Sequence, residues 1–278
     1  MNLAIVTDST CDISDDLAES NHIHIVPNLV IIEEQSLEDG KDITRQEFYE
    51  RLPTMKKHPT TATASSGAYQ QLYEKLFQQG ASQILSIHAS SLLSGIFGAA
   101  SAAAQAFGER VGVVDSEHIS MGLGFQVLAA AEAVTLGATR EIVISLLKEI
   151  RQRIHLVAML DTLEYVRRSG RVSWARARLG NLLSVKPFVG IRNGLVNSLG
   201  ETRTRRKGIE RLKQFLRDLG ALERLAILHT NAEADARQFL EEINIHLPTN
   251  PLLVNVTTVI GAHAGPNGLG FVALRKVK

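Results

Sequence analysis

The segment from Gln83 to Phe107, QILSIHASSLLSGIFGAASAAAQAF, contains the two patterns that decide the fold. Its first part, Ile84 to Ile87, is a short apolar run typical of a buried strand. The chain then breaks at Ala89-Ser90-Ser91 and continues with mostly Ala, Gly and Ser. Small side chains let a helix approach its neighbours closely, so we expect a strand, a turn and a buried helix.

A membrane-spanning helix is the alternative explanation, because no charged residue occurs between Lys75 and Glu109. Such a span needs about 20 predominantly apolar residues. Here four serines and His88 interrupt the apolar run, and its period changes part-way. The pattern therefore favours the strand and helix, and we expect no stable insertion into a membrane.

Ser94 and Gly95 fall near the predicted start of this helix. A helix N-terminus presents unpaired N–H groups and a partial positive charge, which suit a carboxylate or a phosphate. An ordinary capping serine is the other explanation for Ser94.

The composition excludes several classes of protein. Of the 278 residues, 45% are hydrophobic and 21% charged, which is typical of a globular chain. A net charge of +1 and 5% aromatic residues argue against nucleic-acid binding. Cys11 is the only cysteine, so an internal disulfide and a cysteine-rich metal site are excluded. Strand-like residues begin at Leu3, without a signal segment, so we expect a cytoplasmic protein.

The order of elements predicts an α/β fold with two domains. In the first half, apolar strands at Leu3–Val6, Ile84–Ile87 and Val111–Val114 alternate with helices, which indicates a parallel sheet flanked by helices. The second half contains an Asn193-Gly194 hairpin beside short helices, which favours an α+β domain. We place the domains at residues 1–152 and 153–278.

Polar residues follow two of the predicted strands directly. Asp8-Ser9 comes after the first strand and Asp115-Ser116 after the strand at Val111–Val114. Open α/β sheets bind ligands at the carboxyl ends of their strands. Capping of the turn by Asp8 or Ser9 is the simpler alternative.

Three further regions are interpreted from their local patterns. Pro59 biases the chain toward an extended form, so we expect an extended loop at Thr60–Thr63 and a helix from Ser65 or Ser66. His24–Ile32 is predicted as one strand, followed by a polar turn at Gln35–Lys41. The glycines and proline of Gly261–Gly268 predict a rigid turn that is neither helix nor strand. A histidine held there, His263, could donate to an anion or act as a base, or simply lie at the surface.

Known enzyme motifs leave one catalytic alternative open. The chain has no P-loop, dinucleotide fingerprint, His-Glu-x-x-His or Gly-x-Ser-x-Gly pattern. A serine hydrolase using Ser94 and His263 stays open, because catalytic triads are defined by geometry. A nucleic-acid-binding regulator using the basic cluster at Arg203–Lys207 is weaker, given the near-neutral charge.

A series of short motifs also runs along the whole chain in one order. They are Asp8-Ser9, the Pro59/Thr61/Ser65 loop, Leu93-Ser94-Gly95, Asp115-Ser116 with Ser120 and Gly122, Leu163-Glu164-Tyr165 through Gly170-Arg171, Gly180 with Lys186-Pro187, the Arg203 cluster, and Gly261 with His263, Gly265 and Pro266. Their joint order resembles that of the DegV family of bacterial fatty-acid-binding proteins.

The resemblance implies two α/β domains with a long acyl chain in a tunnel between them. It implies that Thr61 and Ser94 hold the carboxylate, with Gly95 and His263 nearby. Two departures fall in these loops. The usual Thr-Ser-Gln-Pro-Ser is here TATAS (residues 61–65), and the usual Leu-Ser-Gly-Thr is LSGI (residues 93–96), but both head-group residues are retained.

The resemblance also implies a role in phospholipid synthesis. It implies that the ligand is a long-chain fatty acid such as palmitate or oleate, with no cofactor, no metal and no catalytic nucleophile. It also implies a separate ATP-dependent kinase that makes the acyl phosphate from the presented carboxylate. Arg171 and Arg203 are candidates for contact with that kinase or with its phosphate.

Overall fold

The computed structural model describes residues 2–176, 185–243, 245 and 247–277 and divides into two compact units. The first unit contains residues 1–29, 62–152 and 193–195, and the second contains 30–61, 153–192 and 196–278. The segment 30–61 groups with the C-terminal half in these units. The two domains expected at residues 1–152 and 153–278 stay a prediction.

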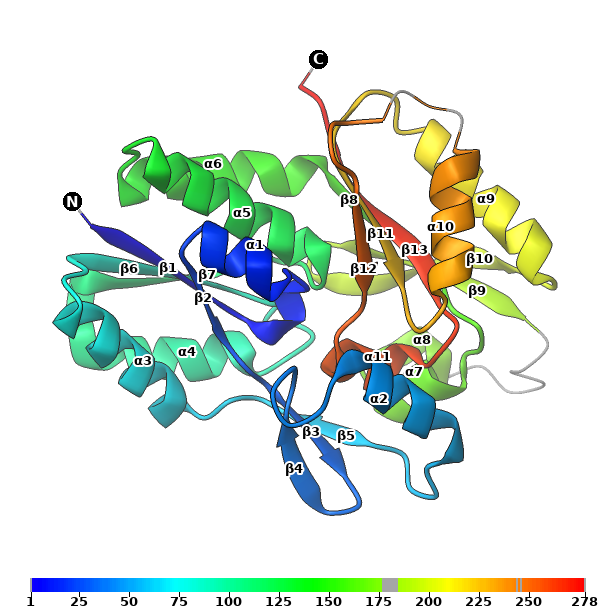
Figure 1. Cartoon of the computed structure of the whole chain (residues 1–278), viewed down its shortest axis with the longest axis horizontal. Coiled ribbons are helices and arrows are strands. Elements are labelled where there is room, and N and C mark those ends of the chain that lie inside the picture. Colours follow the sequence, from blue (N-terminus) through cyan, green and yellow to red (C-terminus); the bar gives the residue numbers. More distant parts are fainter. Residues whose placement is uncertain (1, 177–184, 244, 246, 278) are drawn as a thin grey trace. The chain divides into compact units, whose positions relative to one another are not determined.

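The first unit is a parallel sheet covered by helices on both faces (Figure 1). Its strands, in the order β2-β1-β6-β7, are β2 (Ile23–Val26), β1 (Leu3–Asp8), β6 (Gln83–His88) and β7 (Val111–Asp115). One face carries α1 (Asp15–Ser20), α5 (Met121–Thr135) and α6 (Arg140–Arg153), and the other carries α3 (Ser66–Gln78) and α4 (Ile96–Ala104). Short 3₁₀ helices, η1 (Ser9–Cys11) and η3 (Gln105–Arg110), complete it. The predicted parallel sheet flanked by helices is confirmed.

Serine side chains cap the starts of two helices in the first unit. Ser14 accepts a hydrogen bond from the Leu17 N–H at the start of α1, and Ser65 accepts one from the Ala68 N–H at the start of α3. Such caps each contribute about 1 kcal/mol to helix stability.

The prediction that the helix after Ser94 is buried was wrong in part. Only one face of α4 is buried, formed by Ile96 and three alanines. The fully covered helix is instead α5, which is buried from Met121 through Ala131 and packs on β1, β6 and η1. Gly124 permits this packing, since a Cβ there would lie 2.5 Å from the carbonyl oxygen of Cys11.

The second unit is built on a mixed six-stranded sheet in the order β10-β9-β8-β13-β11-β12. These strands are β10 (Leu195–Thr202), β9 (Lys186–Arg192), β8 (Ile154–Met159), β13 (Leu269–Arg275), β11 (Leu222–His229) and β12 (Leu252–Asn255). Helices α9 (Arg205–Arg217) and α10 (Glu233–Glu242) pack on it over a core that includes Phe188, Phe239 and Phe271. The predicted hairpin turn is present, with φ of 52° at Asn193 and 75° at Gly194. The α+β prediction is confirmed.

The segment from residue 30 to 61 forms a small sheet in the order β4-β3-β5. It contains β3 (Leu29–Ile32), β4 (Gln35–Glu38), β5 (Thr60–Ala62), α2 (Arg45–Arg51) and η2 (Leu52–Thr54). The single strand predicted at His24–Ile32 was wrong, because Pro27 and the buried Asn28 separate β2 from β3. The prediction of a turn at Gln35–Lys41 was also wrong in part, because its first four residues form β4.

Three short helices complete the second unit, namely α7 (Glu164–Ser169), α8 (Ser173–Arg176) and α11 (Thr258–Ala264). The predicted helix from Ser173 to Leu182 is described only over α8, and its remainder, with Gly180, lies outside the described residues. Among the residues that the structure describes, no helix has the length and apolar character needed to span a bilayer.

Two glycines give a matched test of this packing. Gly261→Ala should destabilise the protein by about 1–3 kcal/mol, because the new methyl would lie 2.3 Å from the buried Tyr49 hydroxyl. Gly98→Ala should stabilise it by about 0.5–1 kcal/mol, because Gly98 lies inside α4 with no atom within 4 Å of a Cβ. Urea unfolding followed by circular dichroism measures both changes. Equal effects would contradict the packing of α11 on Tyr49.

Candidate functional site

His263 lies on α11, and the prediction that it sits in a rigid glycine turn was wrong. The helix begins at Thr257, whose hydroxyl accepts a hydrogen bond from the Val259 N–H at 3.1 Å. It ends at Gly265, with φ of 79° and a close approach to the Tyr165 ring. The glycines therefore serve close packing and the helix end, and they place His263 in the last turn of a helix.

Within the second unit, α11 brings His263 against Thr61 on the edge strand β5. The distance between Thr61 Oγ1 and His263 Nε2 is 3.0 Å, and both residues are partly buried. The other ring nitrogen, Nδ1, is buried and has no hydrogen-bond partner among the described residues. A buried imidazole nitrogen without a hydrogen-bond partner lowers the stability of the folded protein. Such an atom needs an explanation, and a ligand atom that binds to it is one.

The surroundings keep His263 neutral. Burial, followed by the positive charge of Arg171 and by His58, lowers the pKa of His263 from 6.5 to about 4. A neutral imidazole with its proton on Nε2 donates to Thr61 Oγ1 and leaves the Thr61 hydroxyl proton available for another acceptor. The pair can thus present a hydroxyl donor without a buried positive charge.

His58 and Tyr165 are two neighbours to which the sequence analysis gave no role. Their ring centroids are 5.4 Å apart, and His58 Nε2 is another buried nitrogen without a partner in the described part of the chain. Burial and the charge of Arg168 lower the pKa of His58, although a hydrogen bond with the Ala262 backbone opposes the shift. No sequence signal pairs these rings, because α7 and the loop before Pro59 meet only in the folded unit.

Ser94 and Gly95 belong to the first unit, in the turn between β6 and α4. The Ser94 N–H donates to the Ser90 carbonyl at 3.1 Å, and Ser94 Oγ accepts from the Ile96 N–H at 3.4 Å. The Ser94 hydroxyl proton therefore stays available. Gly95 stands at the N-cap of α4 and has no side chain with which to cap it, and a Cβ there would lie 3.7 Å from Thr63 Cγ2. The turn of Ser94 and the loop after β5 are therefore neighbours in the first unit.

Arg171 and Arg203 are exposed on the second unit. Arg171 follows Gly170, which ends α7 with φ of 71°, and its guanidinium donates to the Ser169 carbonyl at 2.8 Å. Arg203 lies in the link between β10 and α9. Arg171 acts electrostatically on His263, and both arginines have the exposure that a partner contact requires.

A hydrogen-bonded serine, histidine and aspartate do occur together, but not at the positions proposed for a hydrolase. Ser86 Oγ lies 2.7 Å from His88 Nε2, and His88 Nδ1 lies 2.9 Å from Asp8 Oδ2. All three side chains are completely buried, and Ser86 accepts a further hydrogen bond from the Tyr73 hydroxyl. This arrangement lacks the exposed hydroxyl that a nucleophilic serine needs.

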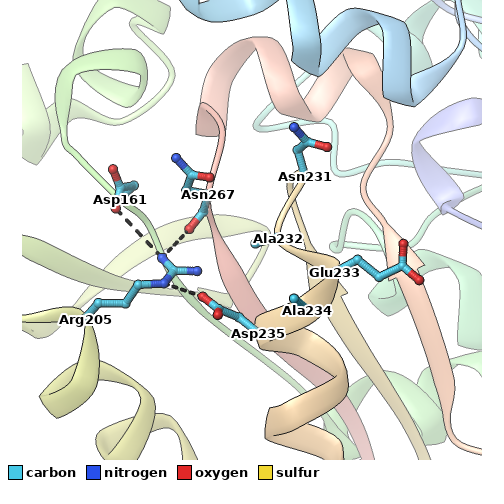
Figure 2. A pocket seen from close by; sticks show the side chains of 8 residues that line it. All are labelled: Asp161, Arg205, Asn231, Ala232, Glu233, Ala234, Asp235 and Asn267. Atoms are coloured by element: carbon cyan, nitrogen blue, oxygen red, sulfur yellow. Dashed lines mark hydrogen bonds and ion pairs between the residues drawn. The ribbon is translucent and has the colours of Figure 1, made fainter.

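A pocket of about 400 Å³ in the second unit is lined mainly by polar groups (Figure 2). Arg205 is its central cation. It donates to Asp235 and to the Asn267 carbonyl, and lies 3.8 Å from Asp161. The only apolar lining residues are two alanines, at 232 and 234, so this pocket does not suit an acyl chain. No group of three His, Cys, Asp or Glu suited to a metal ion occurs within the described residues.

The neutral state of His263 can be measured directly. In an NMR titration, the His263 ring should titrate near pH 4 rather than near pH 6.5, and Arg171→Ala should raise that pKa. The matched variant Arg203→Ala should leave it unchanged. Because the unfolded chain takes up this proton at a higher pH than the folded chain, His263 also makes the protein less stable as pH falls from 6.5 to about 4. An ordinary pKa in the folded protein would contradict the proposed surroundings.

Comparison with known proteins gives matches along the full chain. The model of the DegV family, described as "Uncharacterised protein, DegV family", matches residues 2–276. Protein DegV of Bacillus subtilis is 34% identical over 278 residues, which is 98% of each chain.

Solved structures agree with that match. A DegV family protein from Thermus thermophilus, described by its fatty acid binding, is 31% identical with a TM-score of 0.90, covering 99% of this chain and 100% of that one. DegV of Bacillus subtilis, described as a fatty acid binding protein, is 33% identical with a TM-score of 0.88 over the same shares. With the motif order, the two-unit architecture and these relatives in agreement, the chain belongs to the DegV family.

Proposed function

We propose that this protein binds a long-chain fatty acid, such as palmitate or oleate, and holds its carboxylate through Thr61 and Ser94. The observation that carries the proposal is the 3.0 Å contact between Thr61 and His263, in a chain similar to proteins described as fatty acid binding. Gly95 stands at the start of α4 without a capping side chain of its own, and the N–H groups of a helix start favour a negative charge.

Neutral donors suit this task. Hydroxyl and N–H groups can satisfy a carboxylate without a buried lysine, which avoids removing a second charge from water. His263, held neutral, is proposed to fix the Thr61 hydroxyl by donating from Nε2, so that the hydroxyl proton points to the ligand oxygen. Such hydrogen bonds to a charged group contribute about 1.5–3 kcal/mol each, and they fix which end of the ligand is held.

The acyl chain is expected to supply most of the affinity. At about 0.8 kcal/mol per buried CH₂, about fourteen methylenes offer about 11 kcal/mol before the costs of ordering are subtracted. We therefore propose a buried apolar tunnel for the tail.

The protein is further proposed to act as a carrier in the cytoplasm rather than as the catalyst. It would present the carboxylate to a separate ATP-dependent fatty acid kinase. Arg171 and Arg203, both exposed, are the proposed contacts for that kinase or for the phosphate that it transfers.

Fatty-acid binding and its head-group residues can be tested together. Native mass spectrometry after purification should reveal a bound fatty acid, and the delipidated protein should bind oleate. Thr61→Val and Ser94→Ala should each weaken binding by about tenfold or more, because a hydrogen bond to the carboxylate is lost.

Thr60→Val is the matched control, since Thr60 precedes Thr61 on β5 and is exposed. A protein that is consistently lipid-free and binds neither palmitate nor oleate would refute the proposal. Specific labelling of Ser94 by a serine-reactive phosphonate would favour the hydrolase instead.

The partner contact makes a separate prediction. Arg171→Ala and Arg203→Ala should slow acyl-phosphate formation by a purified fatty acid kinase while leaving oleate affinity unchanged. Arg237→Ala, on the exposed face of α10 in an ion pair with Glu233, should affect neither. Equal loss of lipid binding and phosphorylation would indicate a structural role for the arginines.

A further inference from the structure

We propose that Asp8 is a positioning residue for the head-group site, whose buried carboxylate ties the loop after β5 to the turn before α4. The inference rests on the proposed function, because the turn carries Ser94 and the loop follows β5, the strand that carries Thr61. All of the contacts that support it lie within the first unit.

The Asp8 carboxylate lies at the end of β1 and accepts five hydrogen bonds. Oδ1 accepts from the N–H and the hydroxyl of Thr10 and from Asn28 Nδ2, while Oδ2 accepts from His88 Nδ1 and the Ala89 N–H. Asp8 itself is fully buried. A carboxylate with donors on both oxygens fixes the distances among every segment that supplies one.

Asn28 connects this carboxylate to the loop after β5. Its amide nitrogen donates to Asp8 Oδ1 at 3.2 Å, and its amide oxygen accepts from the Ala64 N–H at 3.3 Å. Asn28 is also fully buried, so the link has no competition from water. Ala64 lies three residues after Thr61 and directly before Ser65, the N-cap of α3.

The second connection reaches the turn before α4. His88 ends β6 and Ala89 follows it, and both donate to Asp8 Oδ2, at 2.9 and 3.2 Å. The chain continues from Ala89 into the Ser90–Gly95 turn, where the N–H groups of Leu93 and Ser94 donate to the Ser90 carbonyl. Asp8 thereby holds the residue at which this turn begins.

The charge of Asp8 is what makes the tie strong. Burial would raise the pKa of Asp8, but the hydrogen bond and charge of His88, with the bonds from Thr10, outweigh it and hold the pKa below 3.8. An ionised carboxylate accepts from all five donors, whereas an amide in its place would turn its NH₂ group toward two or three of them.

The experiment compares Asp8→Asn with Tyr73→Phe in the full-length protein. Both change the same buried network, but Tyr73 donates only to Ser86, on the far side of His88 from the loops. Two quantities are measured: amide hydrogen exchange at Ala64 and Ala89 without ligand, relative to amides of β7, and the Kd for oleate.

Asp8→Asn should speed exchange at Ala64 and Ala89. If only a tenth of its molecules keep both segments in the binding arrangement, the apparent Kd rises about tenfold. Tyr73→Phe should leave exchange at both amides and the Kd unchanged. Should Asp8→Asn fail to fold, Asn28→Ala takes its place, and exchange should then quicken at Ala64 but not at Ala89.

The outcomes separate this inference from the proposed function. A folded Asp8→Asn variant with wild-type exchange and wild-type Kd overturns the inference, as does an Asn28→Ala variant with unchanged exchange at Ala64. Equal effects from Asp8→Asn and Tyr73→Phe also overturn it, because they would reflect general loss of stability. If the wild-type protein bound no fatty acid while Asp8→Asn loosened both segments, the proposed function would fail and the tie through Asp8 would stand.

Discussion

A buried carboxylate must be matched by donors, and the Asp8 side chain imposes this requirement on the centre of the first unit. An uncompensated ion in a protein interior costs more than most single interactions can offset. The chain meets the requirement with five donors from three places in the sequence, at Thr10, Asn28 and His88-Ala89. Each donor lies at or just beyond the end of a parallel strand. The hydrogen bonds to this one charge therefore also fix the positions of the segments that leave the carboxyl edge of the sheet.

The second unit differs, because the proposed site side chains there, Thr61 and His263, carry no charge. His263 sits among Arg171 and His58 in a partly buried position, and it stays unprotonated at neutral pH. Its contact with Thr61 then offers a hydroxyl rather than a cation. A cationic site would attract a carboxylate more strongly, but removing its own charge from water would cost free energy. For the proposed carrier, neutral donors would orient the carboxylate of the ligand, and its apolar tail would supply the affinity.

Much of the local structure could be predicted because it depends on neighbouring residues. Ser14 and Ser65 cap helices, Asn193-Gly194 makes a hairpin turn, and apolar runs form parallel strands for reasons contained within a few positions. The order of motifs correctly indicated the DegV family. Features that depend on distant packing were missed. Helix α11 forms where glycines suggested a turn, because Gly261 lets Tyr49 approach. The segment 30–61 joins the second unit because its sheet and α2 pack there.

The Asp8 case shows why pattern alone could not separate its two explanations. A strand-end aspartate can cap a turn or serve a binding site, and the sequence is equally compatible with both. In the structure one carboxylate does both, since Oδ1 accepts from the Thr10 N–H as a cap does and also from Asn28, while Oδ2 accepts from His88 and Ala89. The same reasoning separates the Ser86–His88–Asp8 array from a catalytic triad. The hydrogen bonds resemble those of a triad. However, Ser86 is fully buried and its oxygen accepts from the Tyr73 hydroxyl, so it is not exposed to a substrate. The residue types of this array would allow catalysis, but their burial leaves them a structural role, which for Asp8 is the proposed positioning of the loops.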